Sequence, residues 1–323
     1  MGAVLVCGGA GYVGSHTCKA LAKAGFQPVA YDNLCAGHRE LVKWGPLVEG
    51  DLLDGARIRE AIRTHGCTAV IHFAGAVNVG ESSTDPRKFV QNNVVASATL
   101  LDAMLEEGVK RIVFSSTCAT YGIPGKVPIS EDHPKAPVNH YGETKRFVEE
   151  MLAAYERAYG LGWVALRYFN AAGADVDGEA GELHDPETHL LPLAIDAALG
   201  RGKPLTVFGT DYPTPDGTAV RDYIHVADLA DAHVRALKRL EDGGASLAAN
   251  LGTGTGSSVL SILRAVEAEV GAPVPHSFGP RRAGDPPALV ADASLAKREL
   301  GWVPAAGLDE IVRSAVRWHR ARS

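Results

Sequence analysis

Short apolar runs alternate with longer one-sided apolar segments through the first half of the chain. Continuous apolar runs of this length are typical of strands buried on both faces of a sheet. They predict strands at Val4–Cys7, Pro28–Tyr31, Ala69–Phe73, Arg111–Ser115 and Trp163–Arg167. The amphipathic segments predict helices at Gly14–Ala24, Gly55–His65, Pro86–Glu107 and Tyr141–Tyr159. This alternation predicts an α/β fold, a doubly wound parallel sheet with helices on both faces.

The pattern changes in the second half of the chain. Glycine, proline and acidic residues are frequent in Gly173–Pro186, and turn-forming residues fill Tyr212–Gly217. Helical periodicity predicts helices at Leu190–Leu199, Ala227–Leu240 and Val259–Val270. We therefore expect a sheet domain over residues 1–169 and a smaller α/β domain over residues 170–323. A return of the chain to the first domain near residues 220–250 stays open.

A glycine-rich turn joins the first predicted strand to the first predicted helix. Gly8 permits the tight turn, Gly11 lets the backbone approach a pyrophosphate, and Gly14 lets the helix pack on the strand. Tyr12 and Val13 lie in the same turn, where free N–H groups at the helix start favour anions. The motif and its position predict a Rossmann-type dinucleotide site. The chain has no GxxxxGK[ST] motif, which disfavours a nucleoside-triphosphate site.

The ends of the next strands predict which dinucleotide binds. Asp32, followed by Asn33, ends the second predicted strand, where a carboxylate accepts hydrogen bonds from ribose and repels a 2′-phosphate. This favours NAD over NADP, although Asp32 is also suited to capping a loop. Two further segments are expected to line the adenine edge and the pyrophosphate and nicotinamide side. Asp51 and Leu52 are expected at the adenine edge, and Phe73, Ala74 and Gly75 on the pyrophosphate and nicotinamide side.

A YxxxK pair at the start of a predicted helix carries the candidate chemistry. Tyr141 and Lys145 share one helix face, so the ammonium is expected to favour the phenolate and lower the tyrosine pKa. Tyr141 then serves as a general base toward an alcohol while hydride leaves to the cofactor. Thr117, at a strand end, is expected to bind the same hydroxyl. The alternative is an exposed Tyr/Lys pair on a surface helix.

Composition and charge narrow the partners. The net charge of −6 gives no general attraction for nucleic acid, and no apolar run is long enough to span a membrane. The N-terminus lacks a basic start and leads directly into a motif, so we expect mature sequence. Five cysteines without a CxxC predict free thiols in a reducing cytoplasm. The twelve histidines form neither HxH nor HExxH, so no metal site is expected.

The motifs together resemble the extended short-chain dehydrogenase/reductase superfamily and, within it, the UDP-glucose 4-epimerases. The resemblance runs from Val4 to about Trp302 and rests on VCGGAGYVGSHT, YDNLCAG, VIHFAG, FSSTCATYG, YGETK, LRYFNAAGA and NLGTG. RDYIHV together with YPTPDGT is specific to the epimerase branch. The resemblance implies a Rossmann fold, tightly bound NAD and a homodimer in which Pro86–Glu107 and Tyr141–Tyr159 pair across the interface.

The resemblance also assigns roles by position. Tyr141 is the expected base, Lys145 its activator and Thr117 the hydroxyl partner, while Asn92 and Phe169 contact the cofactor. The expected UDP-sugar contacts are Asn170, His189, Leu190, Thr206, Val207, Phe208, Arg221, Arg282, Asp285 and Leu289. The guanidinium forks of the two arginines suit a diphosphate.

The implied activity is inversion of C4 of a UDP-hexose through a transient 4-keto sugar, as between UDP-galactose and UDP-glucose. Dehydratases of the superfamily need an acid/base pair after the active-site hydroxyl, and Cys118 and Ala119 cannot fill that role. Open alternatives are a UDP-pentose or UDP-uronate 4-epimerase and a non-catalytic NAD-binding protein. The preferred sugar, the pathway and the redox form of the cofactor stay open, although galactose metabolism is the expected setting.

Three positions depart from common family patterns, and a fourth bears on the choice of sugar. Thr117 replaces a frequent serine and supplies the same hydroxyl, whereas Val77 replaces a lysine that some members use to hold the cofactor. His189 replaces an asparagine, which leaves that substrate contact open. Leu289 occupies the position beside the sugar, where a bulky residue disfavours N-acetylated sugars. We therefore expect unacetylated hexoses.

Overall fold

Seven parallel strands form the central sheet in the order β11-β6-β5-β4-β1-β2-β3. The structure is a computed structural model that describes residues 2–282 and 284–322. The strands are β1 (Ala3–Cys7), β2 (Gln27–Asp32), β3 (Leu47–Glu49), β4 (Cys67–His72), β5 (Arg111–Thr117), β6 (Gly162–Tyr168) and β11 (Leu247–Leu251). The predicted doubly wound sheet and its five predicted strands are confirmed. β3 and β11 were not predicted, because one has three residues and the other carries the polar Asn250.

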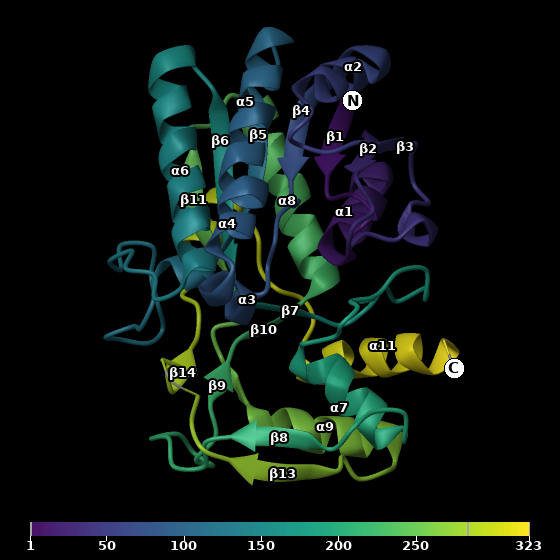
Figure 1. Ribbon diagram of the computed structural model, residues 1–323, viewed down its shortest axis with the longest axis vertical. Coiled ribbons are helices and arrows are strands. Elements are labelled where there is room, and N and C mark those ends of the chain that lie inside the picture. The colour runs from purple at the N-terminus through teal and green to yellow at the C-terminus, as the bar shows by residue number, and fades with distance from the viewer. Residues whose placement is uncertain (1, 283, 323) are drawn as a thin grey trace.

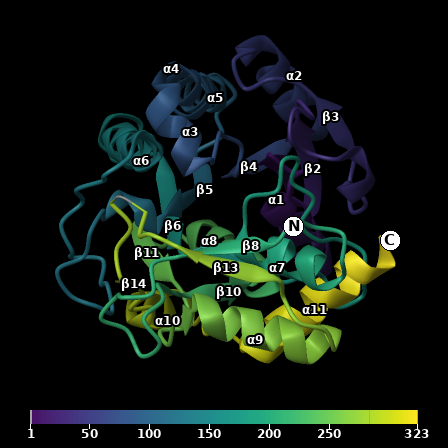
Figure 2. The same cartoon turned by 60° about the horizontal axis from the view of Figure 1, so that its bottom comes forward.

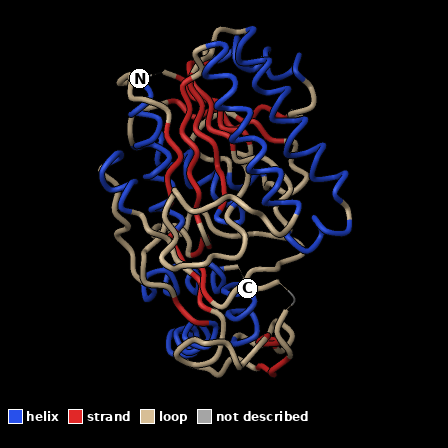
Figure 3. The backbone as a smooth tube through the Cα atoms, turned by 90° about the vertical axis from the view of Figure 1, so that its left-hand side faces the viewer, coloured by secondary structure: helices blue, strands red, loops and turns tan. Residues whose placement is uncertain are grey.

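Helices cover both faces of this sheet (Figures 1 and 3). Along β1, Leu5 and Cys7 pack in one core cluster, whereas Val4 and Val6 pack in another, as the twofold alternation of a strand requires. The first cluster includes side chains of α2 (Gly55–His65), α5 (Ala96–Glu106) and α6 (His140–Tyr159). The second includes those of α1 (Tyr12–Lys23), α8 (Val226–Glu241) and α10 (Ser294–Leu300).

The predicted helix Pro86–Glu107 is interrupted. Its sequence forms α4 (Pro86–Phe89), a π-helical segment η2 (Val90–Val95) and then α5, preceded by the unpredicted α3 (Val79–Thr84). A π turn adds a residue to the turn, so it rotates the side chains that follow relative to an α-helix. This rotation matters for the site, because the π-helical segment contains the neighbouring asparagines Asn92 and Asn93.

A smaller unit lies below the carboxyl ends of the strands (Figures 1 and 2). Its core joins α7 (Leu190–Ala198), α9 (Val259–Val270) and α11 (Leu308–Ala321). Short strand pairs complete it: β8 (Leu205–Phe208) with β13 (His276–Gly279), and β9 (Val220–Arg221) with β12 (Ser257–Ser258) and β14 (Ala288–Leu289). β7 (Asn170–Ala172) pairs with β10 (Tyr223–His225). Two 3₁₀ turns, η1 (Arg39–Leu41) and η3 (Cys118–Thr120), complete the described elements.

The chain passes between the two units more than once. After β10 it enters α8, which packs on the sheet, and β11 then pairs with β6. The division at residues 169 and 170 stays a prediction. None of the helices in the described ranges has the length and apolarity that a membrane crossing requires.

Candidate active site

The glycine-rich turn leaves the end of β1 in a form that only glycine allows at two positions. Gly8 has a positive φ of 80°, in the left-handed region. A Cβ on Gly14 would lie 2.0 Å from the carbonyl oxygen of Gly8, whereas one on Gly11 would meet the same oxygen at 3.3 Å. Gly11 is the N-cap of α1 and provides no side-chain acceptor. The first N–H groups of α1 therefore stay available for an anion.

The turn lies at the point where the strand order reverses. β1 is flanked by β2 on one side and β4 on the other, and ligands of such sheets bind outside the carboxyl ends there. The backbone N–H groups of Phe73 and Ala74 donate to the carbonyl of Cys7 at 2.8 and 3.1 Å. A Cβ on Gly8 would lie 2.8 Å from Ala74 N. The predicted cofactor segments 8–14 and 73–75 are thus in direct contact.

Asp32 accepts hydrogen bonds from the backbone of the glycine-rich turn and of the loop after β2. Its carboxylate, 8% exposed, accepts hydrogen bonds from Ala10 N at 3.0 Å and from Leu34 N at 2.9 Å. Burial raises the pKa of this carboxyl, and the two backbone donors oppose that rise. The loop-capping role and the ribose role are therefore compatible, because each oxygen keeps a second lone pair. Nearby, Asn33 Nδ2 donates to Asp51 Oδ2 at 2.8 Å.

The other predicted cofactor residues have defined places. Tyr12 donates its hydroxyl to the carbonyl of Gly173 at 2.5 Å, which links the turn to the segment after β7. Leu52 is buried in the core cluster on the α2 face, and Val13 and Phe73 pack against the cluster on the opposite face.

The start of α6 brings the catalytic candidates together. Asn139 caps the helix by accepting from Gly142 N at 2.8 Å, and a Cβ on Gly142 would lie 2.5 Å from Ala119 O. The first turn of α6 therefore packs directly on the segment after β5. There the Thr117 side chain lies beside Tyr141 and opposes the rise in the pKa of the phenol.

Lys145 lies one helical turn further along α6 and is 3% exposed. Its Nζ donates to the carbonyl oxygen of Ser115 at 3.0 Å and lies 6.0 Å from the centroid of the Tyr141 ring. The sequence-predicted trio of Thr117, Tyr141 and Lys145 is therefore assembled at the carboxyl end of β5.

The electrostatics of the pair differ from expectation. Burial raises the pKa of Tyr141 above its usual value, and nearby Tyr168 adds to the rise. Burial also lowers the pKa of Lys145 to about 8. The expected lowering of the tyrosine pKa is wrong for these side chains alone, because desolvation dominates and the Lys145 ammonium donates to a backbone carbonyl instead of to the phenol.

Asn93, which the sequence did not single out, is buried between the cofactor loop and α6. Its Oδ1 accepts from Ala76 N at 2.7 Å, and its Nδ2 donates to Ala76 O and Thr144 Oγ1, both at 3.0 Å. Asn92, chosen by resemblance, donates instead to Lys88 O at 2.8 Å. The π turn decides which asparagine points inward, and α-helical periodicity carries no signal for it.

The predicted substrate residues are distributed over the edge of the smaller unit. Arg221 pairs with Asp285 and lies in register with Leu289 across β9 and β14. The guanidinium of Arg282 lies 4.3 Å from the centroid of the Phe208 ring. Each cation is thus held in place by its neighbour.

The remaining substrate candidates lie closer to the sheet and on α7 and β8. Asn170 Nδ2 donates to Asp222 O at 3.3 Å. Phe169 packs in a small cluster that Leu289 joins, together with Cys118 of the segment after Thr117. Leu190 begins α7, and His189 precedes it. In β8, Val207 is buried and Thr206 is exposed.

A family model described as "NAD dependent epimerase/dehydratase family" matches residues 4–252. The chain belongs to this family. Among relatives in the family, UDP-glucose 4-epimerase of Rhizobium leguminosarum bv. trifolii is 55% identical over 316 residues, 98% of this chain and 97% of the relative.

Solved structures of the family are similar over the whole length. UDP-glucose 4-epimerase from Brucella ovis in complex with NAD is 53% identical, with a TM-score of 0.97 over 98% of both chains. The enzyme from Stenotrophomonas maltophila, solved with bound NAD and formylated UDP-arabinopyranose, is 41% identical with a TM-score of 0.97. It covers 100% of this chain and 99% of its own.

Proposed function

We propose that the protein is an isomerase, a UDP-sugar 4-epimerase that uses NAD to invert C4 of UDP-galactose and UDP-glucose. The observation that carries the proposal is the meeting of Thr117, Tyr141 and Lys145 beside Gly75, in the segment 73–75 that contacts the glycine-rich turn. Full-length similarity to UDP-glucose 4-epimerases supports the choice of reaction within the family. A non-catalytic NAD-binding protein is disfavoured, because such a protein has no need of the buried Tyr/Lys pair.

The residues at the switch point fit NAD. Gly8 and Gly14 leave no room for a Cβ, and Asp32 presents a carboxylate that accepts ribose hydroxyls and repels a 2′-phosphate. NAD, when bound, supplies a hydride acceptor for C4 and a positive charge that favours the phenolate. We expect it to remain bound through extensive dialysis, since the reaction returns it to the oxidised form.

The side chains of this protein then handle one proton. Tyr141 Oη takes it from the 4-hydroxyl of the sugar, and Thr117 Oγ1 holds that hydroxyl in line. Lys145, whose Nζ lies 6.0 Å from the centroid of the Tyr141 ring, provides a cation that stabilises the phenolate. The 4-keto sugar must then present its other face, after which Tyr141 gives the proton back.

The diphosphate must be held firmly while the sugar turns. Arg221 and Arg282 supply charge and fork geometry, and Asp285 and Phe208 restrict their motion. A pentose substrate stays a second candidate, because the similar enzyme from Stenotrophomonas maltophila was solved with formylated UDP-arabinopyranose. Leu289, beside the predicted sugar position, favours unacetylated sugars by size.

We further infer a homodimer through α6 and the helices before α5. Phe147 is 49% exposed and Tyr159 52%, both on α6, and Val90 and Val95 of η2 are exposed nearby. Apolar side chains gathered on neighbouring helices are typical of an interface. The five cysteines are free, which suits the reducing cytoplasm expected from the sequence, with galactose metabolism as the proposed setting.

The test uses purified, dialysed protein and UDP-galactose with no added NAD. We expect UDP-glucose to form, and Tyr141→Phe to lower kcat at least about 10³-fold, because it removes the acid/base hydroxyl. The control is Tyr159→Phe, which removes a hydroxyl at the opposite end of the same helix and keeps the aromatic ring inferred for the dimer interface. No product without added NAD, or an active Tyr141→Phe, would refute the proposal. UDP-xylose and an N-acetylated substrate in the same assay define the sugar.

A further inference from the structure

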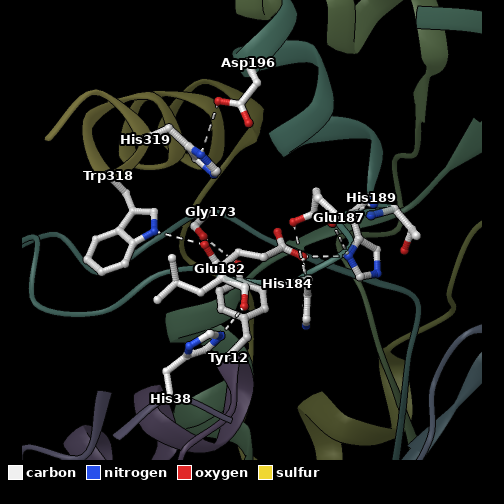
Figure 4. A network of polar contacts seen from close by, with 12 residues as sticks. Tyr12, His38, Gly173, Glu182, His184, Glu187, His189, Asp196, Trp318 and His319 are labelled. Atoms are coloured by element: carbon white, nitrogen blue, oxygen red, sulfur yellow. Dashed lines mark hydrogen bonds and ion pairs between the residues drawn. The ribbon is translucent and has the colours of Figure 1, made fainter. Parts of the chain in front are cut away.

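Two histidines and two glutamates converge in the segment that leads into α7. Glu182, His184, Glu187 and His189 each offer one ligand atom, and all four atoms lie within 4.8 Å of one another. Figure 4 shows the carboxylates and imidazoles turned toward a common centre. The spacing E-x-H-x-x-E-x-H is neither the HxH nor the HExxH pattern typical of zinc sites.

The separations suit a tetrahedral ion. Zinc–ligand bonds of about 2.0 Å place neighbouring ligands about 3.3 Å apart. Nδ1 of His189 lies 2.7 Å from a Glu182 oxygen and 3.2 Å from a Glu187 oxygen. Nδ1 of His184 lies 3.0 and 3.8 Å from oxygens of the same two residues. The ion-pair contacts at 2.7 and 3.0 Å are shorter than about 3.3 Å, so those side chains would move apart by a few tenths of an ångström to take zinc, and the 3.8 Å pair would move closer.

The carboxylates are held in place before any ion arrives. The Glu182 side chain is 5% exposed, and its backbone carbonyl accepts from Trp318 Nε1 at 3.1 Å. Glu187 Oε1 accepts from Thr188 N at 2.7 Å and His189 N at 2.8 Å, and its second oxygen faces His184. Backbone anchors of this kind orient metal ligands and limit the entropy lost on binding.

A neighbouring acidic cluster differs, because a lysine side chain already occupies its centre. Asp175, Asp177 and Glu179 also gather within 4.8 Å, but the ammonium of Lys19 lies among them at 2.6–2.8 Å. Within the described residues, the ion-pair partners of Glu182 and Glu187 are the two imidazoles of His184 and His189. A neutral imidazole has a free nitrogen lone pair that can bind a metal ion, whereas an ammonium has donors only and occupies the space between the carboxylates.

We propose that Glu182, His184, Glu187 and His189 bind one divalent transition-metal ion, with zinc as the fitting member. Mixed imidazole and carboxylate ligands favour zinc and its first-row neighbours over calcium or magnesium, which prefer oxygen alone. All four positions come from protein, so the site is closed and structural rather than catalytic.

The ion would tie together parts that the function needs. His189, itself among the expected UDP-sugar contacts, is the N-cap of α7 and precedes Leu190 of the same set. The His184 ring lies 6.3 Å from that of Tyr12 in the glycine-rich turn. Glu182 is anchored to Trp318 of α11. Zinc would therefore fix the segment 182–189 between the cofactor turn and the smaller unit.

The test is zinc titration of the NAD-loaded protein, made without an affinity tag that binds metal and treated with chelator. We expect one zinc per chain, measured by competition with a zinc dye and by elemental analysis, and a higher Tm with zinc. His184→Ala should weaken binding at least about tenfold and remove the Tm shift. His184 lies outside the predicted catalytic, cofactor and substrate sets, so the variant is expected to keep its NAD. Retained NAD then shows that the variant is folded.

The matched control is the double variant Asp177→Asn/Glu179→Gln, which alters exposed carboxylates of the neighbouring cluster. It should bind zinc as the parent does. Fewer than one zinc per chain, or equal binding by His184→Ala and the parent, would overturn the proposal and leave an ion-pair cluster in its place. Neither result depends on epimerase activity, so the proposed function is judged separately.

Discussion

Glu149 shows how one buried carboxylate supports the catalytic strand and helix together. It lies on α6, and its oxygens accept from Arg167 Nε at 2.8 Å and Nη2 at 2.6 Å, and from Ser116 Oγ at 2.7 Å. The side chains of the ion pair are 2% and 3% exposed. Arg167 also donates to Tyr121 Oη at 2.8 Å. The network therefore connects α6 to β5 and β6 directly behind Thr117 and Tyr141.

We expect Glu149→Gln to lower the free energy of unfolding by about 3 kcal/mol at pH 7, because it leaves the Arg167 charge buried without its counter-ion. Burial raises the pKa of Glu149, but Arg167 and Ser116 outweigh it and hold that pKa below its usual value. A lowered native pKa gives stability that is present above about pH 4.5 and lost as the pH falls. The difference between parent and variant should therefore shrink in acid.

Urea unfolding at several pH values measures both effects. Glu150→Gln, at an exposed neighbour on α6, is the control and should change stability by less than about 0.5 kcal/mol. A difference between parent and Glu149→Gln that grows as the pH falls would contradict the assigned direction.

At the scale of elements, continuous apolar runs and amphipathic periodicity were enough to predict most of the sheet and its covering helices. The failures have local causes. The π turn at Val90–Val95 breaks the 3.6-residue period, so the inward asparagine was not identified. The pKa of Tyr141 depends on burial by neighbours distant in sequence, which spacing does not reveal. The cluster in 182–189 needed the folded loop to bring its ligands together.

Two glycines of the turn between β1 and α1, Gly14 and Gly11, should respond differently to substitution by alanine. In Gly14→Ala the new Cβ would meet the backbone of Gly8 and Gly9, which cannot move without displacing α1 from β1. We expect a loss of at least about 2 kcal/mol in stability, and no retained NAD. Gly11→Ala adds a Cβ at a φ of −83°, which any residue adopts, with one contact at 3.3 Å.

Gly11→Ala should therefore fold with stability within about 1 kcal/mol of the parent yet hold NAD less tightly, because its methyl group faces the predicted pyrophosphate. Thermal unfolding and the nucleotide released on denaturation measure the two properties. Equal loss of stability in both variants would show that the turn tolerates neither, and that the steric distinction is wrong.

At the scale of the molecule, the two units are joined by polar contacts around α1. Tyr12 reaches Gly173, and Lys19 reaches the acidic cluster Asp175, Asp177 and Glu179. Both contacts start from the helix whose N-terminus is predicted to bind pyrophosphate. The position of the smaller unit is thereby coupled to the cofactor turn.

Lys19→Met tests that coupling, because it leaves three carboxylates close together without their cation. We expect a loss of about 2 kcal/mol in stability and faster cleavage of the segment 174–187 by a glutamyl endopeptidase. Burial lowers the pKa of Lys19, but hydrogen bonds to the three carboxylates outweigh it and raise that pKa above its usual value. The charge on Lys19 therefore persists from about pH 6 to 9, and the loss of stability should be constant over that range.

Two further variants serve as controls. Lys23→Met, at an exposed position on the same helix, should resist cleavage like the parent. Adding Asp175→Asn to Lys19→Met should restore part of the stability. If Lys19→Met left both stability and cleavage unchanged, the Lys19 ion pairs would not couple the two units, and the other contacts, such as that of Tyr12 with Gly173, would have to hold them together.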